Sequence, residues 1–221
     1  MTSVARKKSY DDACAIAHGL DLVGDRWALL VARELVLGPK RFTDLLSTLP
    51  GISTDMLAQR LRELTASGIT ERRRLPAPAS SWVYELTEWG AELEPVMTQL
   101  ARWSSRSSSL PRDAPISVDA LILSMRALFE TKTEDDFRAT VAIRVGEDHF
   151  WVKIEGDRLD LGRGDAGEAE ISISSDVHSL RRLIHTAEPL DRLVADGGLQ
   201  VTGDLARLDR WRRRLLPAET G

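Results

Sequence analysis

In the first half of the chain, apolar residues recur every three or four positions in short segments, which is the period of amphipathic helices. Glycine, proline or serine separates these segments and marks where each helix starts or stops. The pattern predicts helices at residues 12–20, 25–37, 42–49, 54–67 and 88–103. Two runs typical of strands, 69–75 and 81–87, flank the sequence PAPAS and predict a β-hairpin. Helices followed by a hairpin are the element order of a winged helix-turn-helix domain.

A polar segment then interrupts the apolar pattern. The sequence SSRSSSLPRDAP at 104–115 is rich in serine, proline and charge, which is typical of a linker. We therefore expect three parts: a winged helix-turn-helix domain for DNA binding and dimerisation at 1–103, a linker at 104–116, and a second domain at 117–221.

The second domain has a different order of elements. Helices are expected at 117–130, 176–186, 189–196 and 204–216, strands at 137–145, 149–155, 158–162 and 169–175, and a short apolar stretch at 199–202. Glycines mark the turns between the strands. The predicted fold class is α+β, with an antiparallel sheet and helices in this domain.

The helix at 54–67 has two contrasting faces. At 100° per residue, one stripe is apolar and is expected to be buried; it consists of Met56, Leu57, Leu61 and Leu64. Gln59 and Arg62 lie opposite, and their amide and guanidinium groups suit adenine and guanine edges in the major groove. Arg60 falls within the stripe, so we expect it to brace the fold through a carboxylate.

Polar groups around this helix suit backbone phosphates. They lie in the turn before the third helix, at the start of the 54–67 helix, and on one face of the first hairpin strand. The predicted DNA-binding residues are therefore Lys40, Arg41, Ser53, Thr54, Gln59, Arg62, Arg72 and Arg74. Each could instead be a solvated surface group. Their joint occurrence in this topological order favours double-stranded DNA as a partner.

The first half also resembles the HxlR family of bacterial winged-helix regulators from about residue 12 to residue 103. The resemblance is carried by the stretches CAIAHGLDLVGDRWALLVARELVLGPKRFTDLLSTLPGIS, TDMLAQRLRELTASGITERR and YELTEWGAELEPVMTQLARW. It implies a homodimer, formed by the first and last helices, that binds a two-fold related operator. The wing tip LPAPASS departs from the family because it is neutral and carries two prolines, which weakens the case for wing contact with the minor groove.

The apolar stripe of the 88–103 helix fits this expectation, since it ends on Trp103 just before the linker. It comprises Leu93, Val96, Met97, Leu100 and Trp103. The alternative is that the stripe packs only on its own domain.

Cys14 is the only cysteine, which excludes an internal disulfide and fits a reducing cytoplasm. A helix N-terminus and the basic residues 6–8 favour its thiolate, whereas Asp11 and Asp12 oppose it. The HxlR resemblance implies a sensor of oxidants or electrophiles at this position, forming a bridge between subunits or a mixed disulfide. The alternative is a small buried apolar residue.

The second half resembles the sterol carrier protein-like fold. The residues that suggest this are Phe137, Val141, Ile143, Phe150, Val152, Ile154, the segment Ile171-Ser172-Ile173 and the sequence LQVTGDLARLDRW. The resemblance implies an apolar tunnel for a lipid or another hydrophobic small-molecule effector, with Phe129, Phe150, Val152 and Leu183 as candidate ligand-binding residues. The alternative is that these side chains fill a closed core.

The net charge of −4 does not decide the question of DNA binding. Residues 1–110 hold 14 Lys and Arg against 13 Asp and Glu, and the remainder holds 16 against 21. Phosphate contacts need only local basic patches. No apolar run is long enough to span a membrane, and MTSVARKKSYDD lacks the apolar core of a secretory signal. We therefore expect a cytoplasmic protein without membrane contact.

Neither catalysis nor a cofactor is expected. His149, His178 and His185 lack the spacing of metal ligands, and no phosphate-binding or dinucleotide motif is present. Two hypotheses remain. The first is a dimeric regulator controlled by an apolar ligand or by Cys14 oxidation. The second is a lipid or hydrophobic small-molecule carrier that uses the winged helix only for dimerisation.

Overall fold

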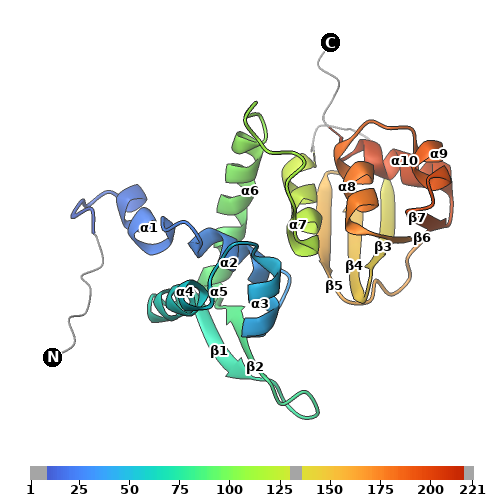
Figure 1. Cartoon of the computed structure of the whole chain (residues 1–221). Helices are drawn as coiled ribbons and strands as arrows, with labels where there is room; N and C mark the ends of the chain where they lie inside the picture. Colours follow the sequence, from blue (N-terminus) through green and yellow to red (C-terminus); the bar gives the residue numbers. More distant parts are fainter. Residues whose placement is uncertain (1–8, 130–135, 217–221) are drawn as a thin grey trace. The chain divides into compact units, whose positions relative to one another are not determined.

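A computed structural model describes residues 9–129 and 136–216 (Figure 1). The chain has a mixed α+β fold and divides into two compact units, Met1–Met97 and Thr98–Gly221. This division falls within helix α6, ahead of the linker expected at 104–116. Among the described helices, none combines the length and the apolar character that crossing a bilayer requires.

The first unit contains a bundle of short helices and a two-stranded hairpin that extends from it (Figure 1). Its elements are α1 (Ala15–Val23), α2 (Ala28–Leu35), α3 (Phe42–Thr48), α4 (Thr54–Ala66), β1 (Thr70–Arg74), β2 (Trp82–Leu86) and α5 (Glu88–Ala91), followed by α6 (Leu93–Ser104). The Ser53 hydroxyl caps α4 by accepting the Met56 N–H at 3.2 Å. Gly68, with φ of +73°, allows the chain to turn into the hairpin.

The helix expected at 88–103 is in fact two helices that meet at Glu92. Pro95 explains the break. It has no N–H to donate to the carbonyl of Ala91, and its ring would clash with that carbonyl in a continuous helix. The proline therefore lies in the first turn of a new helix, where its missing donor costs little.

The core of the first unit comes from α2, α3, α4 and the residues that flank these helices. Its buried residues are Trp27, Ala28, Val31, Leu35, Leu45, Leu49, Ile52, Leu57, Leu61, Leu64 and Ile69. The segment before α3 also pairs with the hairpin. The Lys40 N–H donates to the Tyr84 carbonyl at 3.0 Å, and the Tyr84 N–H donates to the Lys40 carbonyl at 2.8 Å. This pairing fixes the hairpin against the helices.

The second unit is a five-stranded sheet with helices. Its elements are α7 (Val118–Leu128), β3 (Arg138–Val145), β4 (Asp148–Glu155), β5 (Arg158–Arg163), β6 (Ile171–Ser175), α8 (Val177–His185), α9 (Leu190–Ala195), β7 (Leu199–Thr202) and α10 (Leu205–Arg213). The short apolar stretch at 199–202 is thus a strand. Residue 130, the end of the helix expected at 117–130, lies outside the described residues.

The expectation of an antiparallel sheet is wrong, because the sheet is mixed. The strand order is β5-β4-β3-β6-β7, and β6 pairs in parallel with β3. After the β3-β4-β5 meander, the chain returns to the free edge of β3. Strand order depends on such long-range pairing, and hydrophobic alternation within single strands does not reveal it.

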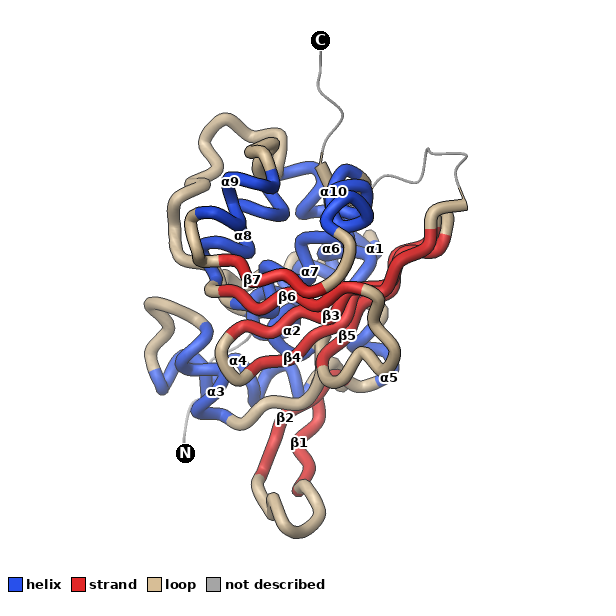
Figure 2. Tube along the Cα trace, turned by 90° about the vertical axis from the view of Figure 1, so that its right-hand side faces the viewer, coloured by secondary structure: helices blue, strands red, loops and turns tan. Residues whose placement is uncertain are grey.

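The two faces of this sheet differ in polarity. Alternate residues of each strand are buried, including Val141, Ile143, Phe150 and Ile171. Figure 2 shows α8, α9 and α10 along one side of the sheet. The residues between the buried ones form the opposite face, where Arg144, Ser172 and Gln200 are exposed.

Candidate DNA-binding surface

Helix α4 has the two-faced character that reading a major groove requires. Leu57, Leu61 and Leu64 are buried against the core, while Gln59 and Arg62 are exposed on the other side. Met56, expected in the buried stripe, is 43% exposed. The stripe is centred on the three leucines, and Met56 lies about 100° from that centre at 100° per residue. It therefore lies at the margin of the buried face.

The two outward polar side chains differ in the hydrogen bonds and ion pairs that they make within the chain. The Gln59 amide donates to Glu63 Oε1 at 3.0 Å across one turn of α4. Arg62 forms no ion pair with any residue in 9–129 or 136–216. Its guanidinium therefore keeps its N–H donors available to an acceptor outside the chain.

Arg60 braces the fold, as predicted. Its guanidinium pairs with Asp25, in the turn before α2, and with Glu63 at 2.6 Å. The side chain is only 12% exposed. This pairing links α4 to the start of α2 and helps to fix the angle at which α4 leaves the core.

The prediction that Lys40 contacts a phosphate is wrong. Its Nζ lies 2.9 Å from Oε2 of Glu34, a fully buried carboxylate on α2, and Lys40 itself is buried. Arg33 donates to the other oxygen of Glu34 at 2.7 Å. The backbone pairing with Tyr84 draws Lys40 inward. A lysine ammonium held in this way is not presented to DNA.

The other residues expected to contact phosphates are exposed. Arg41 precedes α3, and its N–H donates to Asp44 Oδ2 at 3.1 Å. Ser53 accepts the Met56 N–H but keeps its own hydroxyl proton, and Thr54 begins α4 beside it. These groups surround the N-terminal ends of α3 and α4, where the partial positive charge of a helix favours anions.

The hairpin presents its arginines on different faces. Arg72 places its guanidinium carbon 4.6 Å from the ring centroid of the exposed Trp82, and Arg74 donates weakly to the Ser80 carbonyl at 3.4 Å. Arg73 instead pairs with Glu85 on the neighbouring strand. Arg72 and Arg74 therefore carry the free charge of this wing, as the alternation predicted. The role of Trp82 in positioning Arg72 was not predicted.

Arg26 was also missed by reasoning from the sequence. It is exposed at the start of α2 and borders a hollow of about 320 Å³ that also involves Gly51, Met56 and Gln59. Its guanidinium carbon lies 5.4 Å from the centroid of Trp27. Arg26 therefore adds positive charge beside Gln59. Its place in the Gly24-Asp25-Arg26-Trp27 segment was the one available signal.

Cys14 is the N-cap residue of α1 and is exposed, so the alternative of a small buried apolar residue is wrong. The backbone N–H groups of Ala17 and Ile16, in the first turn of α1, lower the pKa of the thiol, while desolvation opposes them. The basic residues 6–8, invoked for the same effect, lie outside the described residues. The helix terminus thus favours the thiolate.

Apolar side chains are exposed on both α1 and α6. Ile16 and Leu20 on α1, and Val96, Leu100 and Trp103 on α6, contact solvent in the single chain, and Trp103 is 68% exposed. Leu93, at the start of α6, packs on the core. Val96, Leu100 and Trp103 therefore remain exposed, while Met97 is half-buried.

In the second unit, the four candidate ligand-binding residues Phe129, Phe150, Val152 and Leu183 are all buried. Phe129 and Phe150 each lie beneath an arginine, Arg214 and Arg163 respectively. Phe150 also borders a hollow on the opposite side of the sheet. Burial of this kind fits both a closed core and the wall of a ligand site.

The helices and the hairpin of the first unit have the element order of a winged helix-turn-helix domain. A model of the HxlR-like helix-turn-helix family matches residues 22–111. The HTH-type transcriptional regulator YodB of Bacillus subtilis is 41% identical over 85 residues, covering 38% of this chain and 76% of YodB. The regulator sll1512 of Synechocystis sp. is 40% identical over 92 residues, covering 42% and 68%. The solved reduced form of YodB matches with 36% identity and a TM-score of 0.40, covering 44% of this chain and 97% of that one.

The chain therefore belongs to the HxlR family, and its N-terminal region is a helix-turn-helix transcriptional regulator of that family.

Proposed function

We propose that this protein is a homodimeric regulator that reads a two-fold related operator by placing one α4 helix of each subunit in the major groove. The observation that carries this proposal is the pair of exposed side chains, Gln59 and Arg62, on the face of α4 opposite its buried leucines. An arginine suits the O6 and N7 acceptors of guanine, and a glutamine suits adenine. Arg41, Ser53, Thr54, Arg72 and Arg74 would bind the flanking phosphates.

The dimer would form through α1 and α6. Both helices expose apolar side chains that a soluble chain normally covers, and these include the large ring of Trp103. Two copies related by a two-fold axis would present two α4 helices to successive major grooves. This arrangement agrees with the dimer that the HxlR resemblance implies.

For the remainder of the chain we propose a linker at 104–116 and a sterol carrier-like effector domain at 117–221. The apolar, helix-covered face of the sheet supports an apolar ligand held beside Phe129, Phe150, Val152 and Leu183. An effector changes DNA binding only if it binds the DNA-competent state and the other state with different affinity. Oxidation of Cys14 is a second proposed input.

The experiment for DNA binding is an electrophoretic shift of a palindromic fragment from the gene's own promoter, at several salt concentrations. Arg62→Ala and Gln59→Ala should each weaken specific binding at least about tenfold, because a lost bidentate base contact costs about 1–3 kcal/mol in each half-site. Arg192→Ala, which removes an exposed arginine from α9, is the matched control. If the protein shifts the fragment at none of the salt concentrations tested, the proposal is overturned and the hydrophobic carrier is favoured.

The input through Cys14 has its own test. After mild peroxide, a non-reducing gel should show a covalent dimer, and Cys14→Ser should abolish it. A chain that remains monomeric on this gel would exclude the bridge between subunits.

A further inference from the structure

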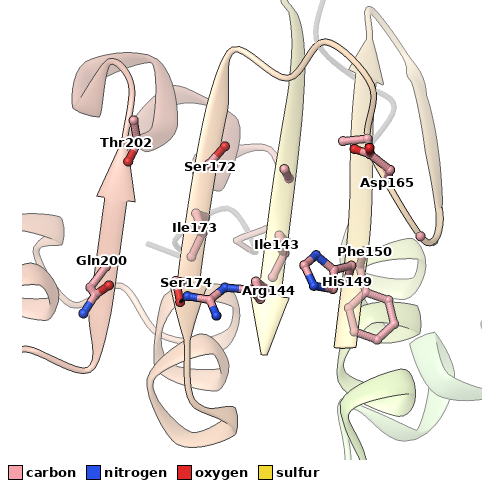
Figure 3. Close-up of a pocket in the computed structure, with 13 residues that line it drawn as sticks. Ile143, Arg144, His149, Phe150, Asp165, Ser172, Ile173, Ser174, Gln200 and Thr202 are labelled. Atoms are coloured by element: carbon pink, nitrogen blue, oxygen red, sulfur yellow. Dashed lines mark hydrogen bonds between the residues drawn. The ribbon is translucent and has the colours of Figure 1, made fainter. Parts of the chain in front are cut away.

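The exposed face of the five-stranded sheet contains a hollow of about 350 Å³ (Figure 3). Two small side chains, Ala142 on β3 and Ser172 on β6, are register neighbours within it. Residues 164–166, after β5, and Thr202 on β7 also border the hollow. Small side chains in the middle of a sheet leave space above the backbone that a ligand could occupy.

A row of hydrogen-bonding side chains crosses four strands beside these small residues. His149 pairs in register with Arg144, Arg144 with Ser174, and Ser174 with Gln200. Register neighbours share a face and are about 4.8 Å apart from strand to strand. Figure 3 shows the four side chains in line. The chain therefore presents an imidazole, a guanidinium, a hydroxyl and an amide along one line.

Among the described residues, Arg144 lacks the carboxylate partner that Lys153 and Arg158 have on the same face of the sheet. Lys153 pairs with Glu155 at 2.9 Å, and Arg158 pairs with Asp160 at 2.7 Å. Within the described part of the chain, Arg144 has no carboxylate partner, and it donates only to Ser174 Oγ at 2.8 Å. Here the positive charge remains unneutralised.

The groups around Arg144 add further hydrogen-bonding capacity. The side chains of Ser172, Gln200 and Thr202 make no hydrogen bond with described residues. One carboxylate, that of Asp165, borders the hollow, and it accepts the Gly167 N–H at 3.1 Å. The hollow thus combines one free cation with several neutral donors and acceptors.

We infer that this hollow binds a small hydroxylated anion, whose carboxylate or phosphate pairs with Arg144. A guanidinium offers parallel N–H donors that match the oxygens of either group. The ligand's hydroxyls would bond to Ser172, Gln200 and Thr202. This site lies on the face of the sheet opposite the proposed apolar ligand, and it does not depend on DNA binding.

Amide chemical-shift mapping of the full chain tests the inference with three probes that share a three-carbon skeleton: glycerol phosphate, glycerate and neutral glycerol. We expect glycerol phosphate, glycerate or both to shift amides of β3, β6 and β7, with a roughly millimolar dissociation constant for so small a ligand. Glycerol should shift none of them. A response to only one anion distinguishes a phosphate site from a carboxylate site.

Variants then assign the binding to this row. Arg144→Gln should weaken it about tenfold or more, because hydrogen bonds to a charged group are the strong ones. Gln200→Ala should weaken it less, and Lys153→Gln, on the same face, should have no effect. Thermal melting should show that all three variants fold. Equal binding by Arg144→Gln, shifts confined to α4 and the hairpin, or no shifts with either anion would overturn the inference.

Discussion

The Lys40 ammonium lies 2.9 Å from the Glu34 carboxylate, in the interior of the winged-helix unit. Glu34 is on α2, and Lys40 pairs through its backbone with Tyr84 of the hairpin. The ion pair therefore joins the helical core to the wing. Charges this far from water are stable only while they are compensated.

The two ends of this pair should not be equivalent to mutation. Glu34→Ala would remove the carboxylate shared by Lys40 and Arg33, and we expect it to lower the free energy of unfolding by about 3–5 kcal/mol. Lys40→Met keeps the volume of the side chain and leaves Arg33 beside Glu34, so its cost should be smaller. Urea unfolding of the two variants checks the order. A larger loss of unfolding free energy in Lys40→Met than in Glu34→Ala would contradict the role of Glu34 as the carboxylate shared by two cations.

The burial of Lys40 also predicts which cations determine the salt dependence of DNA binding. Arg74→Ala should reduce the slope of log affinity against log salt by about two per dimer, one phosphate contact in each subunit. The substitution should weaken binding to specific and to non-specific DNA by similar factors. Lys40→Met, if folded, should leave the slope unchanged. Fluorescence anisotropy with one palindromic and one scrambled duplex gives both quantities. An equal change of slope in both variants would mean that Lys40 reaches the DNA.

Much of the DNA-binding unit could be predicted from local sequence. The leucines of α4, its serine cap and the outward position of Arg62 follow from helical period and capping, which are local properties. The burial of Lys40 could not be predicted in this way, because it depends on a backbone pairing with Tyr84, 44 positions away. The parallel pairing of β6 with β3 escaped prediction for the same reason. Sequence periods report which face is buried but not which element covers it.

Gly90 provides a third prediction, since its lack of a side chain is required by packing. A Cβ at this position would lie 1.9 Å from the carbonyl oxygen of Ile69, a backbone atom that cannot turn aside. We therefore expect Gly90→Ala to destabilise the chain by more than about 2 kcal/mol, through overpacking. Gly19→Ala is the matched control. It lies within α1 with open space around it, so alanine should be neutral or stabilise by up to about 1 kcal/mol. Similar melting temperatures for the two variants would contradict this account.

The position of Cys14 at the start of α1 leads to a prediction about pH. The thiolate is the reactive form, and the N–H groups of Ala17 and Ile16 lower the pKa of the thiol. The alkylation rate should therefore rise through its midpoint at a lower pH than in an unfolded peptide of the same sequence. Ala17→Pro removes the stronger of these two donors at a first-turn position where proline is tolerated, so it should return the midpoint toward that of the peptide. Rates with iodoacetamide across the pH range give both midpoints, and circular dichroism shows whether α1 persists. Coincident midpoints for the native chain and the unfolded peptide would mean that the helix terminus does not activate this thiol.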